Sequence, residues 1–200
     1  CAVEAAEAIT MTSNGNIVAD PTRVKVITRC GPSLEQPKLI TGLALPKKRA
    51  HVEMPSTLGA GSILLVDGGL ELRSLSTDVQ LNVTSTSALQ SFRDAEQQRL
   101  FEQVNMLKKL DVTLLACREG IDDSTHAHLA DAGIKAFRRV AKSDLELLAR
   151  GCGARLVPTI HQAKDADVGV FISSRCERWG DVDHWILETD EGGATFVASG

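Results

Sequence analysis

The segment Val112-Thr-Leu-Leu-Ala-Cys117, which continues as Arg118-Glu-Gly-Ile-Asp-Asp123, decides the fold class of this chain. Its first half is a short apolar run, which is typical of a strand buried on both faces. Its second half is a turn that contains Gly and ends in two acidic residues, which stabilise the first turn of a helix. We therefore predict a helix over 124–132, followed by Gly133, the residue type expected after a helix C-terminus. This order of strand, turn and helix predicts an α/β fold.

The alternation of strands and helices continues on both sides of this segment. Downstream, the spacing Ser143-Asp-Leu-Glu146 predicts a capping box that begins a helix ending near Arg150. Upstream, a long helix is predicted over 85–109, and its terminal Lys108-Lys109 suit a helix C-terminus. Residues 1–9 are predicted to be the end of another helix. The remaining predicted strands lie at 23–28, 39–45, 62–67, 78–84, 134–140, 155–157, 168–173, 184–188 and 195–197.

The composition excludes several classes of protein. The chain has 200 residues, of which 43% are hydrophobic and 24% charged, so it can bury a sizeable core. A net charge of −4 and an aromatic content of 4% without Tyr argue against nucleic acid as a partner. No apolar run approaches the ~20 residues of a membrane span, and the acidic N-terminal segment does not resemble a signal peptide. We therefore expect a cytoplasmic protein that does not bind membranes, and the missing initiator Met indicates a piece of a longer chain.

The sequence offers little catalytic chemistry. It contains neither of the Gly-rich patterns that bind nucleotide phosphates, and its five cysteines form no C-x-x-C pair. On a helix, His126 and His128 would point about 200° apart, so they cannot share a metal ion. A small hydrolase that uses Cys117 with His126, or a pair of carboxylates, remains an alternative, although a buried cysteine is usually inert. We expect no catalytic residue, cofactor or metal in this chain.

Two parts of the chain are expected to lie at the surface. The long helix over 85–109 can pack on a sheet through its residues 100–107, while its first half, 85–99, projects into solvent. Leu89 and Phe92 would then be exposed, which forgoes roughly 1.5–3 kcal/mol for each side chain and marks a contact surface. Separately, Arg138-Arg139 with Lys142 form a basic spot, which we expect to be salt-bridged rather than a phosphate site.

Several linked motifs occur in a fixed order along the chain. They are Cys117-Arg-Glu-Gly-Ile-Asp-Asp123, Leu129-Ala-Asp-Ala-Gly-Ile134, Phe137-Arg-Arg-Val140, Lys142-Ser-Asp144, Leu148-Ala-Arg150 and Gly153-Ala-Arg-Leu-Val157. Together they resemble the apical domain of the group II chaperonins, the family of the archaeal thermosome and the eukaryotic cytosolic chaperonin. Leu89-Gln-Ser-Phe92 resembles the start of the helical protrusion of that family. His51 and Met54-Pro55 resemble its His-Pro-x-Met-Pro turn, with Val52 in place of the proline. This departure from the family pattern indicates a divergent paralogue, and we expect an archaeal one.

The resemblance implies a specific α/β fold and domain organisation. It implies a swivelling β/β/α fold, in which a sheet core is flanked by helices and carries a helical protrusion at about 83–106. Residues 1–38 would be a remnant of the intermediate domain, consisting of a helix end and a strand. Residues 39–200 would form the apical domain.

The resemblance also implies functional residues. Unfolded polypeptide would bind to the helix after the Gly-Ile-Asp-Asp turn, through Ser124, Thr125, His126, His128 and Leu129. The protrusion, with Leu89, Phe92, Arg93 and Glu96, would form part of the built-in lid of an ATP-driven folding chamber.

The resemblance implies partners beyond this chain. They are unfolded polypeptides and the neighbouring subunits of a ring. ATP and Mg would be held by equatorial and intermediate-domain residues of the parent subunit, so this chain alone would not be an enzyme. The alternative is a stand-alone α/β interaction or holdase module without ATPase coupling, which docks a partner through Leu89 and Phe92.

Overall fold

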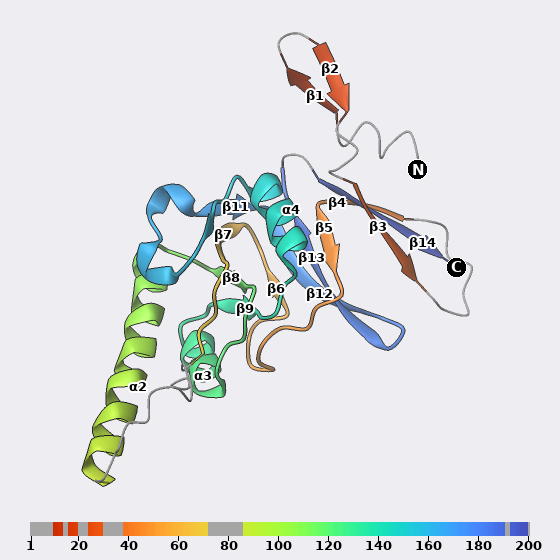
Figure 1. Cartoon of the computed structure of the whole chain (residues 1–200). Helices are drawn as coiled ribbons and strands as arrows, with labels where there is room; N and C mark the ends of the chain where they lie inside the picture. The colour runs from red at the N-terminus through yellow and green to blue at the C-terminus, as the bar shows by residue number, and fades with distance from the viewer. Residues whose placement is uncertain are drawn as a thin grey trace.

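The computed structural model describes residues 10–13, 16–19, 24–29, 38–71, 86–190 and 193–199 (Figure 1). The helix end predicted at 1–9 and the strand predicted at 78–84 lie outside these described residues.

A mostly parallel sheet forms the centre of the fold. Its strands are β7 (Gly61–Val66), β8 (Leu114–Cys117), β9 (Lys135–Phe137), β10 (Leu156–Val157) and β11 (Gly169–Phe171). They follow the order β10-β7-β8-β9, all parallel, and β11 pairs with β7 in the antiparallel direction. All four residues of β8 are buried, as expected for a parallel strand covered on both faces. The strand predicted at 134–140 is only three residues long.

Three helices cover the two faces of this sheet: α2 (Thr86–Lys109), α3 (Asp123–Asp131) and α4 (Lys142–Cys152). Successive side chains of a strand point to opposite faces. Leu115 therefore joins the apolar cluster that contains Leu107 of α2 and Leu129 of α3. Leu114 joins the cluster on the other face, which contains Leu148 of α4.

The helix termini correct one prediction and confirm another. The capping box predicted at Ser143 is wrong, because α4 begins at Lys142 with Ala141 as its N-cap and without a side-chain cap. Gly133 follows α3 with a φ of +71°, a conformation that favours glycine, so the predicted helix end is confirmed.

A second, antiparallel sheet packs on the α4 side. Its strands, in spatial order, are β5 (Leu43–Leu45), β13 (Val182–Glu188), β12 (Ser173–Trp179) and β6 (Thr57–Leu58). The ring of Trp185 in β13 stacks on Phe137 in β9 at 3.9 Å between centroids, which joins the two sheets. Strand β12 was not predicted from the sequence, and its residues are mostly half-buried and polar.

A third sheet joins distant parts of the chain. Strand β14 (Ala194–Ser199) lies between β3 (Val24–Arg29) and β4 (Lys38–Thr41), and β1 (Thr10–Ser13) forms a separate hairpin with β2 (Asn16–Ala19). This sheet contains strands from both sides of the predicted boundary at residue 38, and the division into 1–38 and 39–200 stays a prediction.

Gly42 carries the chain from the third sheet into the second. Its φ is +116°, and a Cβ there would lie 2.1 Å from the carbonyl oxygen of Leu187. Only glycine fits this passage.

Candidate functional site

The C-terminal half of helix α2 packs on the core. Its buried stripe is Leu100, Val104 and Leu107, at the i, i+4, i+7 spacing of one helix face. Before Leu100, the exposed residues are Ser91, Asp94, Ala95, Gln97, Gln98 and Arg99. Figure 1 shows this end of α2 extending away from the sheets. The four residues assigned to the lid, Leu89, Phe92, Arg93 and Glu96, lie in this half of α2.

Helix α3 presents only part of the predicted set of client-binding residues. Ser124 and His128 are exposed. Thr125, His126 and Leu129 are buried, with exposed fractions of 0%, 2% and 0%. The expectation that these three side chains meet a client at the surface therefore needs correction. They anchor α3, because the helix turns these positions toward the sheet.

The outer surfaces of α2 and α3 meet at an aromatic contact. Phe101 of α2 is 51% exposed, and its ring lies edge-on to that of His128 with 6.0 Å between centroids. The exposed residues of α3 are spaced as one helix face. We call the combined surface the α2–α3 face; it consists of Phe101, Ser124, Ala127, His128 and Asp131. Sequence reasoning assigned residues 100–107 to packing and so missed Phe101, although its position one residue after Leu100 turns it off the buried stripe.

His126 is held neutral beneath this face. Its Nδ1 lies 3.4 Å from Oδ1 of Asp123, and its ring centroid lies 6.2 Å from that of His51. Its Nε2 has no hydrogen-bond partner among the described residues. Burial, together with the charge of Arg138, lowers the pKa of His126 below its ordinary value. The imidazole is therefore an uncharged part of the helix packing.

The hypothesis of a cysteine nucleophile is wrong. Cys117 is fully buried, and burial, reinforced by the nearby charge of Glu119, raises the pKa of its thiol far above the usual range. Burial also raises the pKa of Cys152 to about 12. Because the thiolate is the reactive form, neither side chain is suited to attack a substrate. Within the described ranges, no group of three or more His, Cys, Asp or Glu could hold a metal ion.

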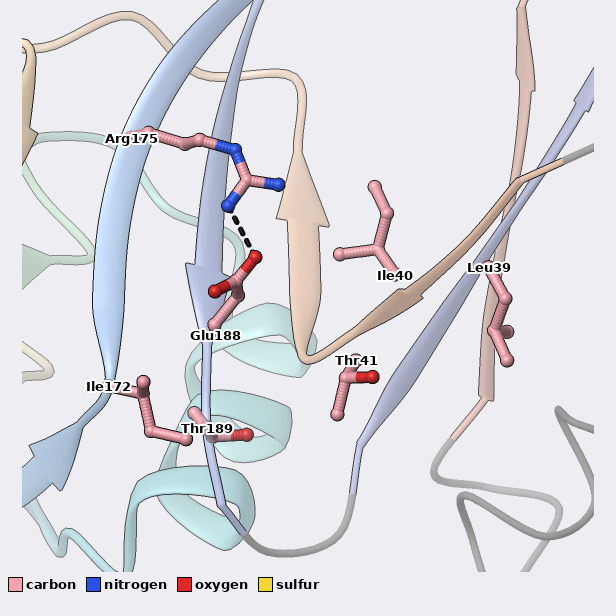
Figure 2. Close-up of a pocket in the computed structure, with 7 residues that line it drawn as sticks. All are labelled: Leu39, Ile40, Thr41, Ile172, Arg175, Glu188 and Thr189. Atoms are coloured by element: carbon pink, nitrogen blue, oxygen red, sulfur yellow. Dashed lines mark hydrogen bonds and ion pairs between the residues drawn. The ribbon is translucent and has the colours of Figure 1, made fainter.

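A groove of about 420 Å³ lies where the second and third sheets meet (Figure 2). Its lining residues are Leu39, Ile40, Thr41, Ile172, Arg175, Glu188 and Thr189. The guanidinium of Arg175 donates to Glu188, which also accepts from Oγ of Ser173 at 2.8 Å. These hydrogen bonds lower the pKa of the Glu188 carboxyl. The two charged groups in the groove thus bind each other and hold β12 against β13.

No helix in the described part of the chain is both long and apolar enough to cross a membrane.

The comparisons with known proteins place these features in context. A model of the TCP-1/cpn60 chaperonin family matches residues 1–200. The chain is 34% identical over 168 residues to the thermosome subunit beta of Archaeoglobus fulgidus, covering 84% of this chain and 31% of that protein. It is equally identical, over 167 residues, to the thermosome subunit of Methanopyrus kandleri, again covering 84% and 31%. The chain thus spans about a third of the length of these relatives.

The fold has a solved counterpart. The open-state monomer of a group II chaperonin from Methanococcoides burtonii matches with a TM-score of 0.78 and 23% identity. The match covers 99% of this chain and 44% of that one. The predicted α/β fold class, with sheets flanked by helices, is confirmed, as is the resemblance to group II chaperonins.

Proposed function

This chain belongs to the TCP-1/cpn60 chaperonin family, and from that premise we propose that its α2–α3 face binds unfolded polypeptide. The observation that carries the proposal is Phe101. Its ring is 51% exposed beside His128, at the junction of two helices. An exposed aromatic ring is an apolar contact for any unfolded chain that passes over it.

The chemistry of the face supports weak and unselective binding. Phe101 and Ala127 are apolar, Ser124 and His128 are polar, and Asp131 is acidic. Such a mixture favours contacts that can be released, because no single side chain contributes a large share of the binding energy. A chaperone that receives many sequences needs this property, whereas a receptor for one partner would favour a shaped pocket.

We further propose that the first half of α2 acts as a lid element. A helix of 24 residues is about 36 Å long, and only its second half carries the buried stripe. The first half has the length and mixed charge to meet a neighbouring subunit. Leu89, Phe92, Arg93 and Glu96 would be its contact residues.

The remaining parts of the function concern the whole protein. We propose that the parent subunit sits in a cytoplasmic ring, binds ATP and Mg through residues outside this chain, and folds its clients in an enclosed chamber. The thermosome relatives support this proposal. In that setting the chain itself contributes the client-binding and lid surfaces, not the hydrolysis.

Suppression of aggregation tests the client face. The full chain is mixed with a chemically unfolded client, without nucleotide, and light scattering is recorded. Covering the exposed half of Phe101 is worth about 1 kcal/mol, so Phe101→Ser should weaken the binding of the client about fivefold. Val170→Ser is the matched control, because Val170 is 71% exposed on β11, a strand that is not part of the α2–α3 face. Equal suppression by the Phe101→Ser variant and the unaltered chain would contradict the proposal, as would suppression that depends on nucleotide.

The size of the native assembly tests the ring. Intact mass and native sedimentation are measured for the product in its source cell. A subunit more than twice this length in a large ring supports the proposal. A free species of 21.4 kDa would instead favour the stand-alone holdase or interaction module.

A further inference from the structure

Two loops far apart in the sequence bring six cationic residues together. The loop after β5 carries three of them, and the segment from the end of β9 to the start of α4 carries the others. We call them the basic loop cluster: Lys47, Lys48, Arg49, Arg138, Arg139 and Lys142. The backbone N–H of Ala50 donates to the carbonyl of Ala136 at 2.8 Å. The ammonium of Lys47 donates to the carbonyl of Arg139. These bonds fix the two loops side by side.

The charges of this cluster are not neutralised within the described part of the chain. Two of its members donate to carbonyl oxygens: Arg49 to Met54 at 2.9 Å and Arg138 to Ile121 at 3.5 Å. No member pairs with a carboxylate among the described residues. Among the described residues, the salt bridges expected for Arg138-Arg139 and Lys142 are therefore absent.

Two carboxylates that border the two loops are engaged with other cations, and a third lies beside a histidine. Glu53 lies 3.7 Å from Nδ1 of His51. Glu119 lies 3.5 Å from Arg118. Asp144, in the first turn of α4, binds Lys25. Glu119 and Asp144 thus have cationic partners outside the basic loop cluster.

This arrangement is unfavourable in isolation. Like charges that are held together repel one another, and the repulsion is only partly screened over the Debye length of ~8–10 Å. Lys48, Arg138, Arg139 and Lys142 are exposed, so their charged groups are accessible to a partner. The chain as a whole has a net charge of −4, which makes a local excess of cations a specific feature of this surface.

We propose that the basic loop cluster binds an acidic segment of a polypeptide. Guanidinium and ammonium groups bind carboxylates through charge-assisted hydrogen bonds, and the planar arginine fork matches a carboxylate with two such bonds. Nucleic acid fits less well, because stacking on bases needs accessible aromatic rings. The ring of His51 lies 6.2 Å from that of His126, and the ring of Phe137 is buried against Trp185.

The cluster is a second surface, distinct from the α2–α3 face. The α2–α3 face centres on an aromatic contact, whereas the basic loop cluster consists of Lys and Arg side chains. A polypeptide could therefore be held through an apolar part at the α2–α3 face and through an acidic part at the cluster.

Binding of a fluorescent poly-glutamate peptide to the full chain tests the inference. The variant replaces three exposed members, Lys48→Gln, Arg139→Gln and Lys142→Gln. At the usual strength of exposed ion pairs, its affinity should fall about tenfold. The matched control removes three exposed cations elsewhere, Lys108→Gln, Lys109→Gln and Arg155→Gln, and should keep the affinity of the unaltered chain. Added salt should weaken the binding of the unaltered chain.

Three results would overturn the inference. One is that the unaltered chain, shown to be folded by its cooperative unfolding transition, does not bind the peptide at low salt. Another is an equal loss of affinity in the variant and in the control. The third is preferential binding of a single-stranded oligonucleotide of matched charge, which would reassign the cluster to nucleic acid. None of these results bears on Phe101, so the proposed client face is tested separately.

Discussion

Replacing Lys135 gives a sharp test of how the two larger sheets are held together. Lys135 lies in β9 and is 0% exposed. Its ammonium donates to the carbonyl of Ser56 at 2.8 Å, and to the carbonyl and Oγ of Ser174 at 3.4 and 3.2 Å. The three N–H groups of the ammonium thus match three acceptors, and Ser174 belongs to the second sheet. Ser174 Oγ also accepts from the indole N–H of Trp185 at 3.1 Å, next to the stacked Phe137.

The expected loss in free energy of unfolding depends on which of the acceptors of Lys135 water can reach. Ser56 is exposed, so its carbonyl can bind water when the lysine is lost. Ser174 is 0% exposed, so water cannot replace the ammonium at its carbonyl and Oγ, which costs ~1–3 kcal/mol. Lys135→Met keeps the length of the side chain and should therefore lower the free energy of unfolding by ~1–3 kcal/mol. Lys135→Ala also leaves a cavity and should cost ~2 kcal/mol more.

The assay is urea unfolding of the unaltered chain, Lys135→Met, Lys135→Ala, Ser174→Ala and the double variant. A coupling energy of ~0.5–3 kcal/mol between Lys135 and Ser174 is expected for groups in one hydrogen-bond network. Burial lowers the pKa of Lys135 in the folded state. Between that lowered pKa and the unfolded value of ~10.4, the unfolded chain binds more protons. The stability of the unaltered chain should therefore rise with pH in this window, relative to Lys135→Met.

One outcome would refute this reasoning directly. If Lys135→Met is as stable as the unaltered chain, or more stable, then burial of the ammonium costs as much as its hydrogen bonds return. Zero coupling with Ser174 would likewise show that the lysine does not tie β9 to β12.

The remaining predictions concern α2, the thiols and His126. Leu89→Ser with Phe92→Ser should leave the midpoint of thermal unfolding nearly unchanged if the first half of α2 projects into solvent; a loss above ~2 kcal/mol would place them in the core. Among the described cysteines, a thiol reagent followed by peptide mapping should label half-buried Cys176 before Cys117, and fast labelling of Cys117 would refute its burial. His126 has a lowered folded pKa, so stability should be full above the unfolded value of ~6.5 and fall as pH drops toward the folded pKa. His126→Gln should remove this fall in a pH series of urea titrations, and an unchanged slope would exclude His126 as its cause.

The parts of the fold that sequence predicted are those with a strong local signal. The run from Val112 to Cys117 is apolar except for Thr113, and its strand β8 pairs with β7 on one side and β9 on the other. The long helix predicted over 85–109 is present as Thr86–Lys109. A regular segment of this length is a helix, because strands are rarely so long. Strand β12 was missed because polar and charged residues, such as Arg175 and Glu177, fill a strand whose stability comes from pairing with β13.

The candidate site was predicted only to the level of the helix that carries it. The motifs led to α3, but the nine residues of this helix mix polar and apolar types, so their pattern does not fix which side faces the core. The tertiary contacts buried Thr125, His126 and Leu129 and left Ser124 and His128 outside. Phe101 became a candidate only when α2 and α3 were seen to meet.

By itself, then, the sequence determined the fold class, the family and the order of the main helices and strands, because periodicity and short motifs are properties of neighbouring residues. Only the tertiary structure decided which distant segments meet. It placed β14 between β3 and β4, buried a lysine against Ser174, which is 39 residues away, and set Lys47 beside Arg139, 92 residues away. Local propensity carries no information about such pairs, since their energy comes from contacts that exist only after the chain has packed.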